Sequence, residues 1–241
     1  MTAPRVLLFD SGMGGLTVAT CVRAQLPHAD LIYSADNAGF PYGAWKEDAL
    51  VARIVHVVGA LIEKAKPDIV VIACNTASTL AMVALREKFA IPFVGTVPAI
   101  KPAAAQTKSN VIGVLATPGT VSREYTHTLI HTYAFHCKVI LHGAKRLAEI
   151  AEQKLKGHPP DLDELRAEIA PVFRKREGKK TDVVVLGCTH YPLLIEDMKQ
   201  VAPWDVSYLD PAPAVAPRGA NGLACPRVRR ARAGVRGRAP G

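Results

Sequence analysis

The sequence predicts an α/β protein with two pseudo-symmetric, doubly wound parallel-sheet halves and an active site between them. Two observations support this fold class. Short runs of aliphatic and β-branched residues alternate with longer amphipathic stretches, which is typical of parallel strands joined by helices. In addition, residues 68–74 (DIVVIAC) and 182–188 (DVVVLGC) match position by position, which indicates an internal duplication.

The first half is predicted to hold four strands and three helices. Each expected strand is a short run rich in Val, Ile and Leu, and each expected helix carries apolar residues every three or four positions. Glycines within residues 12–15 turn the first strand into the first helix, and Pro67 precedes the third strand. We expect strands at 6–9, 31–34, 69–73 and 93–95, helices at 16–25, 47–65 and 76–89, and a loop at 96–102.

The second half repeats this alternation. An apolar run at 111–115 ends in the turn residues of 116–120, and residues 157–160 (GHPP) break two helices apart. We expect strands at 111–115, 139–141, 183–186 and 206–209. We expect helices from the 116–120 turn to about 133, and at 145–156, 162–176 and 193–201. The predicted halves are residues 1–97 and 98–209.

Composition predicts a globular protein of the cytoplasm. Of the 241 residues, 49% are hydrophobic and 21% are charged, which argues against wholesale disorder. The first residues lack the pattern of a secretion signal, and apolar runs stay short of a membrane span, so we expect no membrane partner. Five cysteines, an odd number, favour free thiols in a reducing compartment.

Two of the cysteines are candidate catalytic residues, because Cys74 and Cys188 each end an expected strand. The polar residues that follow them are Asn75 and Thr76 in one half, and Thr189 and His190 in the other. Parallel α/β sheets bind ligands at their carboxyl edges, so two facing halves would bring both thiols to one cleft. A helix that begins after each cysteine would lower the thiol pKa from about 8.5. The alternative is a small core residue, the interpretation we keep for Cys21, Cys137 and Cys225.

Other polar residues have open roles. Asp10 ends the first strand, where an unpaired carboxylate is costly unless a ligand ammonium group or a thiol proton uses it. Tyr42 and Gly43 could donate a hydroxyl and a backbone N–H to a carboxylate, or could form a plain surface turn. Glu149 and Glu152 lie on neighbouring faces of one expected helix, and the sequence does not choose between them. A zinc site of Cys74, Cys188 and His190 is a further alternative, which we rank low.

Five motifs follow one another along the chain: FDSGMGG (9–15), YSADNAGFPYG (33–43), ACNTAS (73–78), GTVPAIKP (95–102) and LGCTHYP (186–192). Together they resemble the glutamate racemases, which are cofactor-independent enzymes of the aspartate/glutamate racemase superfamily. The resemblance covers about residues 5–215. It implies interconversion of L- and D-glutamate without metal or cofactor, which supplies D-glutamate for bacterial peptidoglycan.

The resemblance also implies roles for individual residues. Racemisation removes the α-proton from one face and returns a proton to the other, so one thiolate base and one thiol acid on opposite faces fit the reaction. By resemblance, Cys74 serves one enantiomer and Cys188 the other. Asp10 would assist the first thiol and His190 the second, and Glu152 matches a family carboxylate near His190. The implied substrate contacts are Asp10, Ser11, Tyr42, Gly43, Asn75, Thr76, Thr189 and His190. Because family members are often dimers, the resemblance allows a homodimer.

The C-terminus departs from the family, whose members continue from about residue 210 with a helix that completes the first half. Residues 217–241 contain seven arginines and no acidic residue, so the net charge of +9 falls to +2 for the rest of the chain. One interpretation is a basic arm for nucleic acid or anionic lipid. We favour the other, a reading-frame change that leaves the tail disordered and the first half without a packing helix. We therefore expect no nucleic-acid partner.

Two alternatives to a glutamate racemase stay open. The same fold could act on aspartate or a hydantoin, although residues 95–102 and 188–190 favour glutamate. Alternatively, the chain could be an inactive protein that binds nucleic acid through its arginine-rich tail.

Overall fold

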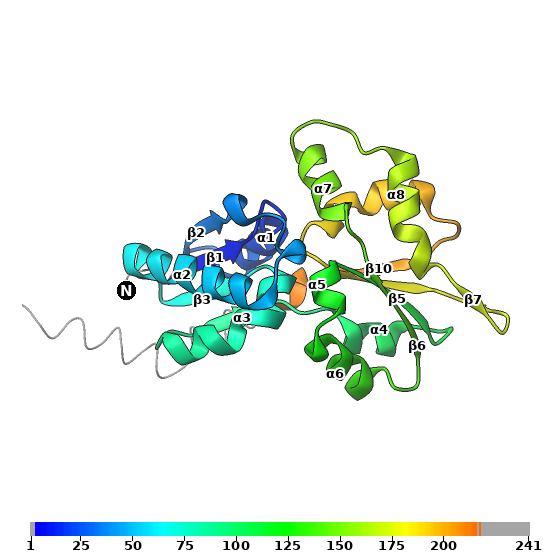
Figure 1. The fold of residues 1–241 in the computed structure, drawn as a ribbon, viewed down its shortest axis with the longest axis horizontal. Coiled ribbons are helices and arrows are strands. Elements are labelled where there is room, and N and C mark those ends of the chain that lie inside the picture. The colour runs from blue at the N-terminus through cyan, green and yellow to red at the C-terminus, as the bar shows by residue number, and fades with distance from the viewer. Residues whose placement is uncertain (1–2, 216, 218–241) are drawn as a thin grey trace, which may run out of the picture.

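The computed structural model describes residues 3–215 and 217, and these form two parallel sheets with helices on both faces (Figure 1). The first sheet has the strand order β2-β1-β3-β4. Its strands are β1 (Arg5–Asp10), β2 (Asp30–Ala35), β3 (Ile69–Ile72) and β4 (Phe93–Gly95). The second sheet has the order β10-β9-β5-β6. Its strands are β5 (Val111–Ala116), β6 (Lys138–Gly143), β9 (Val183–Gly187) and β10 (Ser207–Leu209).

The two sheets have the same topology. When the strands of each sheet are counted from its own first strand, both sheets read second, first, third, fourth. Cys74 and Cys188 follow the third strand of their respective sheets, β3 and β9. The predicted fold class is therefore confirmed, and the matching segments 68–74 and 182–188 occupy equivalent places in it.

Helices cover the first sheet unevenly. Alternate residues of a strand point to opposite faces, so Leu7 and Phe9 pack on one side and Val6 and Leu8 on the other. The side of Leu7 and Phe9 is covered by α2 (Glu47–Ala65) and α3 (Asn75–Lys88). The opposite side is covered by α1 (Leu16–Gln25), and Ala212 and Val215 near the end of the described chain join the same cluster.

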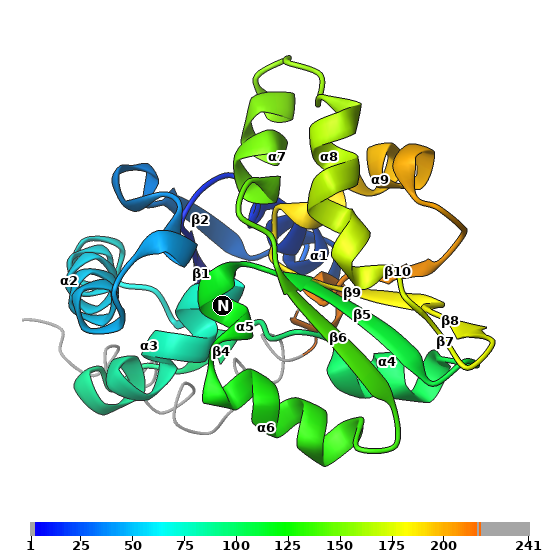
Figure 2. The same ribbon diagram turned by 45° about the vertical axis from the view of Figure 1, so that its right-hand side comes forward.

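The second sheet lies between two helical layers, which Figure 2 shows above and below it. One layer contains α7 (Leu147–Leu155), α8 (Leu162–Ile169), the 3₁₀ turns η3 (Ala170–Val172) and η4 (Tyr191–Leu194), and α9 (Ile195–Val201). The other contains α4 (Ile100–Gln106) and α6 (Glu124–Tyr133). A short helix, α5 (Pro118–Val121), connects β5 to α6 and contacts the 3₁₀ turn η2 (Tyr42–Ala44) of the first half. The first half contains one more described 3₁₀ turn, η1 (Asn37–Gly39), which precedes η2 along the chain.

Three of the predicted elements were wrong. The expected loop at 96–102 gives way to α4, whose Ile100 and Ala103 are buried on the second sheet. The single helix expected to end near 133 is divided into α5 and α6, because Arg123 between them has an extended backbone. The helix expected at 162–176 ends at Ile169.

A hairpin replaces the end of that last helix. The chain passes Pro171, which lacks a backbone N–H, and forms β7 (Lys175–Arg176) and β8 (Lys179–Lys180). Glu177 and Gly178 between these strands have φ angles of 52° and 76°, which close the tight turn.

The division into 1–97 and 98–209 stays a prediction. The predicted tail lies outside the described residues except for Pro217, as does Cys225. In the part of the chain that is described, no helix has the length and apolar character needed to cross a bilayer.

Candidate active site

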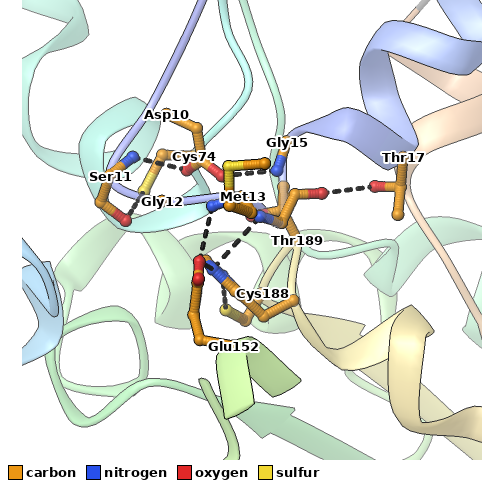
Figure 3. Close-up of polar contacts among 12 residues, drawn as sticks. Asp10, Ser11, Gly12, Met13, Gly15, Thr17, Cys74, Glu152, Cys188 and Thr189 are labelled. Atoms are coloured by element: carbon orange, nitrogen blue, oxygen red, sulfur yellow. Dashed lines mark hydrogen bonds and ion pairs between the residues drawn. The ribbon is translucent and has the colours of Figure 1, made fainter. Parts of the chain in front are cut away.

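The carboxyl ends of the strands in both halves meet at one site (Figure 3). The Thr189 hydroxyl of the second half donates to Asp10 Oδ2 of the first at 3.2 Å. The Met13 N–H of the first half donates to Glu152 Oε1 of the second at 2.6 Å. The loop between β1 and α1 is thus held directly against residues that follow β9 and lie on α7.

Asp10 is fully buried, and backbone N–H groups of the following turn bond to both of its carboxylate oxygens. Oδ1 accepts the Ser11 N–H at 2.8 Å, and Oδ2 accepts the Gly15 N–H at 2.5 Å. Burial raises the pKa of this carboxyl, while the positive charge of His190 and the backbone donors oppose the rise. The turn into α1 therefore supplies the partners that make a buried carboxylate tolerable at this strand end.

The Cys74 thiol lies in a setting that favours its protonated form. Its side chain is 5% exposed, and Sγ lies 3.9 Å from the Ser11 hydroxyl. Burial raises the pKa of Cys74 well above its usual range, and the Asp10 carboxylate and the Cys188 sulfur raise it further. Our expectation of a lowered pKa was wrong, because desolvation and negative neighbours outweigh the N-terminus of α3.

Cys188 has a different partner, the imidazole of His190. Its Sγ lies 3.7 Å from His190 Nδ1, and His190 Nε2 lies 2.9 Å from Glu152 Oε1. Burial alone would lower the pKa of His190, but the contacts with Cys188 and Glu152 raise it to about 10. The hydrogen bond to His190 correspondingly lowers the pKa of Glu152. The imidazole is therefore a cation at neutral pH, and it lies directly beside the sulfur of Cys188.

A close approach of the backbone completes this cluster. A Cβ atom on Gly14 would lie 2.5 Å from His190 Nδ1, and one on Gly12 would lie 2.5 Å from Glu152 Oε1. The Gly14 N–H also faces His190 Nε2 at 3.2 Å. A protonated Nε2 cannot accept this bond, so the shorter contact with Glu152 governs the orientation of the ring. The glycines expected to form a strand-to-helix turn therefore also make room for His190 and Glu152.

The structure distinguishes the two glutamates that the sequence left open. Glu152 is buried against His190, whereas Glu149 forms a partly exposed ion pair with Arg146 at 2.8 Å. Of these two carboxylates, it is Glu152 that bonds to the imidazole beside Cys188. The sequence could not separate them because they stand three positions apart on the same helix.

Buried polar groups between the halves have unused bonding capacity. No group in the described part of the chain bonds to either end of the Asn75 side-chain amide, which is 1% exposed. Next to it in sequence, the Thr76 hydroxyl lies 3.0 Å from that of Thr117 and 3.2 Å from that of Thr120. Because buried polar groups are nearly always satisfied, an amide left open in this way indicates a place for a polar ligand.

Thr117 and Thr120 were missed by the sequence analysis. The sequence nevertheless held a signal for them. The segment ATPGT (116–120) begins at the end of β5, just as DSGMGG (10–15) begins at the end of β1. The internal duplication could have identified them, since the first strand of each sheet ends at the same edge.

Tyr42 and Gly43 were expected to donate to a ligand carboxylate. The Tyr42 hydroxyl instead donates to Asp36 Oδ2 at 2.6 Å, so its proton is already used. Gly43 packs against the second half, where a Cβ atom would lie 2.8 Å from the Thr117 Cβ. The Tyr42 hydroxyl is thus engaged by Asp36, whereas the Gly43 backbone lies beside the threonine hydroxyls.

The zinc alternative finds no geometric support. Among residues 3–215 and 217, no three side chains of His, Cys, Asp or Glu are grouped as a metal ion would require. Cys74, Cys188 and His190 therefore do not make up a ligand set in this arrangement.

A duplicated α/β fold with a cysteine at the equivalent strand end of each half suits a racemase, which needs an acid and a base on opposite faces of one carbon. A model of the Asp/Glu/Hydantoin racemase family matches residues 17–218, and the chain belongs to this family. The resemblance described above is thus confirmed. The chain is 56% identical over 217 residues to the glutamate racemase of Bartonella bacilliformis, covering 90% of this chain and 80% of that one.

Two further relatives agree with this assignment. The glutamate racemase of Brucella canis is 53% identical over 214 residues, covering 88% of this chain and 77% of that one. The crystal structure of Escherichia coli glutamate racemase, in complex with L-glutamate and the activator UDP-MurNAc-Ala, has a TM-score of 0.86 and 46% identity. That match covers 92% of this chain and 83% of the E. coli chain.

Proposed function

We propose that the protein is a glutamate racemase that interconverts L- and D-glutamate without a cofactor and supplies D-glutamate for peptidoglycan. The observation that carries the proposal is the pair of cysteines. They follow equivalent strands of two halves with one topology, and a carboxylate accompanies one while an imidazolium accompanies the other. The relatives named glutamate racemase support the choice of substrate.

The surroundings of the two sulfurs support a two-base mechanism. Nδ1 of the His190 imidazolium lies 3.7 Å from the Cys188 sulfur, while burial and Asp10 raise the pKa of Cys74 and favour its thiol form. In one direction, the Cys188 thiolate takes the α-proton, so that the substrate C–H bond breaks and an S–H bond forms. The Cys74 S–H bond then breaks as its proton moves to the opposite face of the α-carbon. The reverse direction begins from the product state, in which the thiolate is on Cys74.

Polar groups around the sulfurs suit an amino acid with two carboxylates. We assign the substrate contacts to Asp10, Ser11, Gly43, Asn75, Thr76, Thr189 and His190, together with the backbone of Tyr42. The open Asn75 amide and the hydroxyls of Thr76, Thr117 and Thr120 provide donors for carboxylate oxygens. Fixed donors in a site that excludes water stabilise the negative charge that develops as the α-proton leaves.

Isotope exchange tests this function directly. Purified protein is incubated with L-glutamate or D-glutamate in deuterated water, while optical rotation and α-deuteration are followed. We expect both enantiomers to converge on zero rotation with deuterium at the α-carbon, and neither a chelator nor a carbonyl reagent to slow the reaction. Aspartate is the matched control. Turnover of aspartate in preference to glutamate, or no turnover of either, would overturn the proposal.

Three finer expectations belong to the same proposal. We place the enzyme in the cytoplasm, where free thiols persist. We also propose that it forms a homodimer and that its halves divide near residue 97. Light scattering coupled to gel filtration measures the assembly, and limited proteolysis with mass spectrometry measures the boundary.

A further inference from the structure

The loop between β2 and α2, residues 36–45, is fixed by a buried carboxylate. Asp36 is 8% exposed, and its Oδ2 accepts the Tyr42 hydroxyl and the Arg53 Nε–H, both at 2.6 Å. Its Oδ1 accepts from Arg53 Nη2 at 2.5 Å. Both oxygens are therefore bonded to the guanidinium in the two-pronged geometry that only arginine provides.

The same network holds the rest of the loop. The Trp45 Nε1–H donates to the Gly39 carbonyl at 2.8 Å, and the Arg53 guanidinium lies 5.5 Å from the Trp45 ring. The Tyr42 ring is buried in the core of the first half, 6.4 Å from that of Phe9. Since burial would raise the pKa of Asp36, its lowered pKa reflects the hydrogen bonds from Arg53 and Tyr42. Helix α2 thereby anchors the loop at several points.

Two residues of this loop contact the second half at different places. The ring of Phe40 lies 5.3 Å from the ring of His190, the partner of Cys188. Gly43 lies against Thr117, within the hydroxyl cluster that also includes Thr76. A shift of the loop would therefore disturb the substrate pocket on two sides, although Arg53 itself lies on α2 outside the cluster of cysteine partners.

We propose that Asp36 and Arg53 are positioning residues, which hold the 36–45 loop so that Gly43 and Phe40 complete the binding site for glutamate. This inference rests on the proposed function. A partly buried ion pair contributes little net stability compared with an apolar replacement, whereas its fixed geometry can specify one arrangement of the chain. The network thus acts chiefly on substrate affinity, through Tyr42 and Gly43, and it reaches His190 indirectly, through the Phe40 ring.

Steady-state kinetics of Arg53 variants separate these two effects. Arg53→Met keeps most of the side-chain length and removes both donors, so we expect KM to rise about 10-fold while kcat changes less than about 3-fold. Arg53→Lys keeps the charge but cannot bond both oxygens of Asp36. Its KM should therefore lie between that of the parent protein and that of Arg53→Met. Because the enantiomers have equal free energies, kcat/KM must fall equally in both directions. Arg5→Met, which breaks the exposed pair of Arg5 with Asp30 on the same sheet, is the control and should leave KM unchanged.

Hydrogen exchange provides a readout that does not depend on activity. We expect amides 37–45 to exchange faster in Arg53→Met than in the parent protein, and to be unaffected in Arg5→Met. If Arg53→Met does not fold, Tyr42→Phe removes one bond of the network and should produce a smaller rise in KM and in exchange.

The outcomes separate this inference from the proposed function. A lower melting temperature with unchanged KM and unchanged exchange would mean that Arg53 is merely structural, and would overturn the inference. A fall in kcat at constant KM would do the same. If the parent protein lacks glutamate racemisation, the proposed function fails, and exchange at 37–45 still decides whether Arg53 fixes the loop.

Discussion

The surroundings of Cys74 and Cys188 differ, although the two residues occupy equivalent places in two sheets of one topology. The first strand of each sheet ends beside its cysteine, in Asp10 for β1 and in Ala116 for β5. Two positions after each cysteine stands Thr76 in one half and His190 in the other. The duplicated scaffold thus gives the two cysteines equivalent positions. The differences between Asp10 and Ala116 and between Thr76 and His190 give the two sulfurs neighbours of opposite charge.

A symmetric frame thus places two thiols beside groups of opposite charge. A carboxylate next to the buried Cys74 thiol raises the pKa of that thiol, whereas the group next to the Cys188 sulfur is an imidazolium. A two-base reaction needs one sulfur of each kind at the start of each turnover. Four experiments test whether the two cysteines differ in this way.

Removal of either sulfur should have the largest effect. We expect Cys74→Ala and Cys188→Ala each to lower the rate of racemisation at least about 1000-fold, because the reaction needs an acid and a base on opposite faces. Each variant should still exchange the α-hydrogen of a single enantiomer, and the two variants should act on opposite ones. Proton NMR in deuterated water measures the exchange, and polarimetry measures inversion. Two-way turnover in either variant would refute the assignment, and Cys137→Ala is the control.

Loss of the imidazolium should have the next largest effect. We expect His190→Asn to lower kcat about 100-fold, since the Cys188 thiolate loses its adjacent cation. The pH dependence of the remaining rate should differ from that of the parent protein, and the pH–rate profile measures this difference. His158→Asn, at an exposed histidine, should behave like the parent protein. An unchanged profile in His190→Asn would show that the imidazole does not control the sulfur.

The two neighbouring glutamates should differ in their contribution. Glu152→Gln keeps the shape of the side chain but removes the charge that supports His190, so we expect kcat to fall about 10-fold. Glu149→Gln removes only a partly exposed ion pair and should stay within about 2-fold of the parent rate. Parallel steady-state assays measure both variants. Equal losses in the two would mean that the contact of Glu152 with His190 is not used.

The smallest expected effect is on stability. The pKa of His190 is raised to about 10 in the folded protein, above the value of about 6.5 expected when unfolded. Its contribution to stability is therefore complete below about pH 6.5 and is lost as the pH rises through about 10. Urea titrations between pH 7 and pH 10 should show a steeper fall in the free energy of unfolding for the parent than for His190→Asn. Parallel curves would contradict the raised pKa.

Much of the fold and part of the site could be predicted from the sequence, because strand ends, cysteines and the 68–74 and 182–188 match are local signals. The carboxyl ends of parallel strands lie at one edge of the sheet regardless of how the helices pack. Asp10, Cys74 and Cys188 could therefore be chosen as candidate site residues from the sequence alone. The pKa of Cys74 could not be predicted from the sequence, because it depends on burial and on Asp10, which is distant along the chain. Thr117 and Thr120 were missed because threonines after a strand resemble an ordinary helix start.

Helical periodicity also misled the prediction at the end of α8. Charged residues at 174–180 suit an exposed helix and an exposed hairpin equally well, so the apolar pattern carried no information there. Pro171 and Gly178 decided the outcome by local backbone geometry. Similarly, the role of the Tyr42 hydroxyl depends on its bond to Asp36, which is also bonded to Arg53 of α2. No short sequence motif indicates that these loop and helix residues come into contact.

The bond from the Met13 N–H to Glu152 and the bond from the Thr189 hydroxyl to Asp10 both cross between the halves. Each of these bonds ends on a carboxylate that belongs to the surroundings of one sulfur, Glu152 beside His190 and Asp10 near Cys74. A separation of the halves that broke both bonds would therefore change the surroundings of both sulfurs at once.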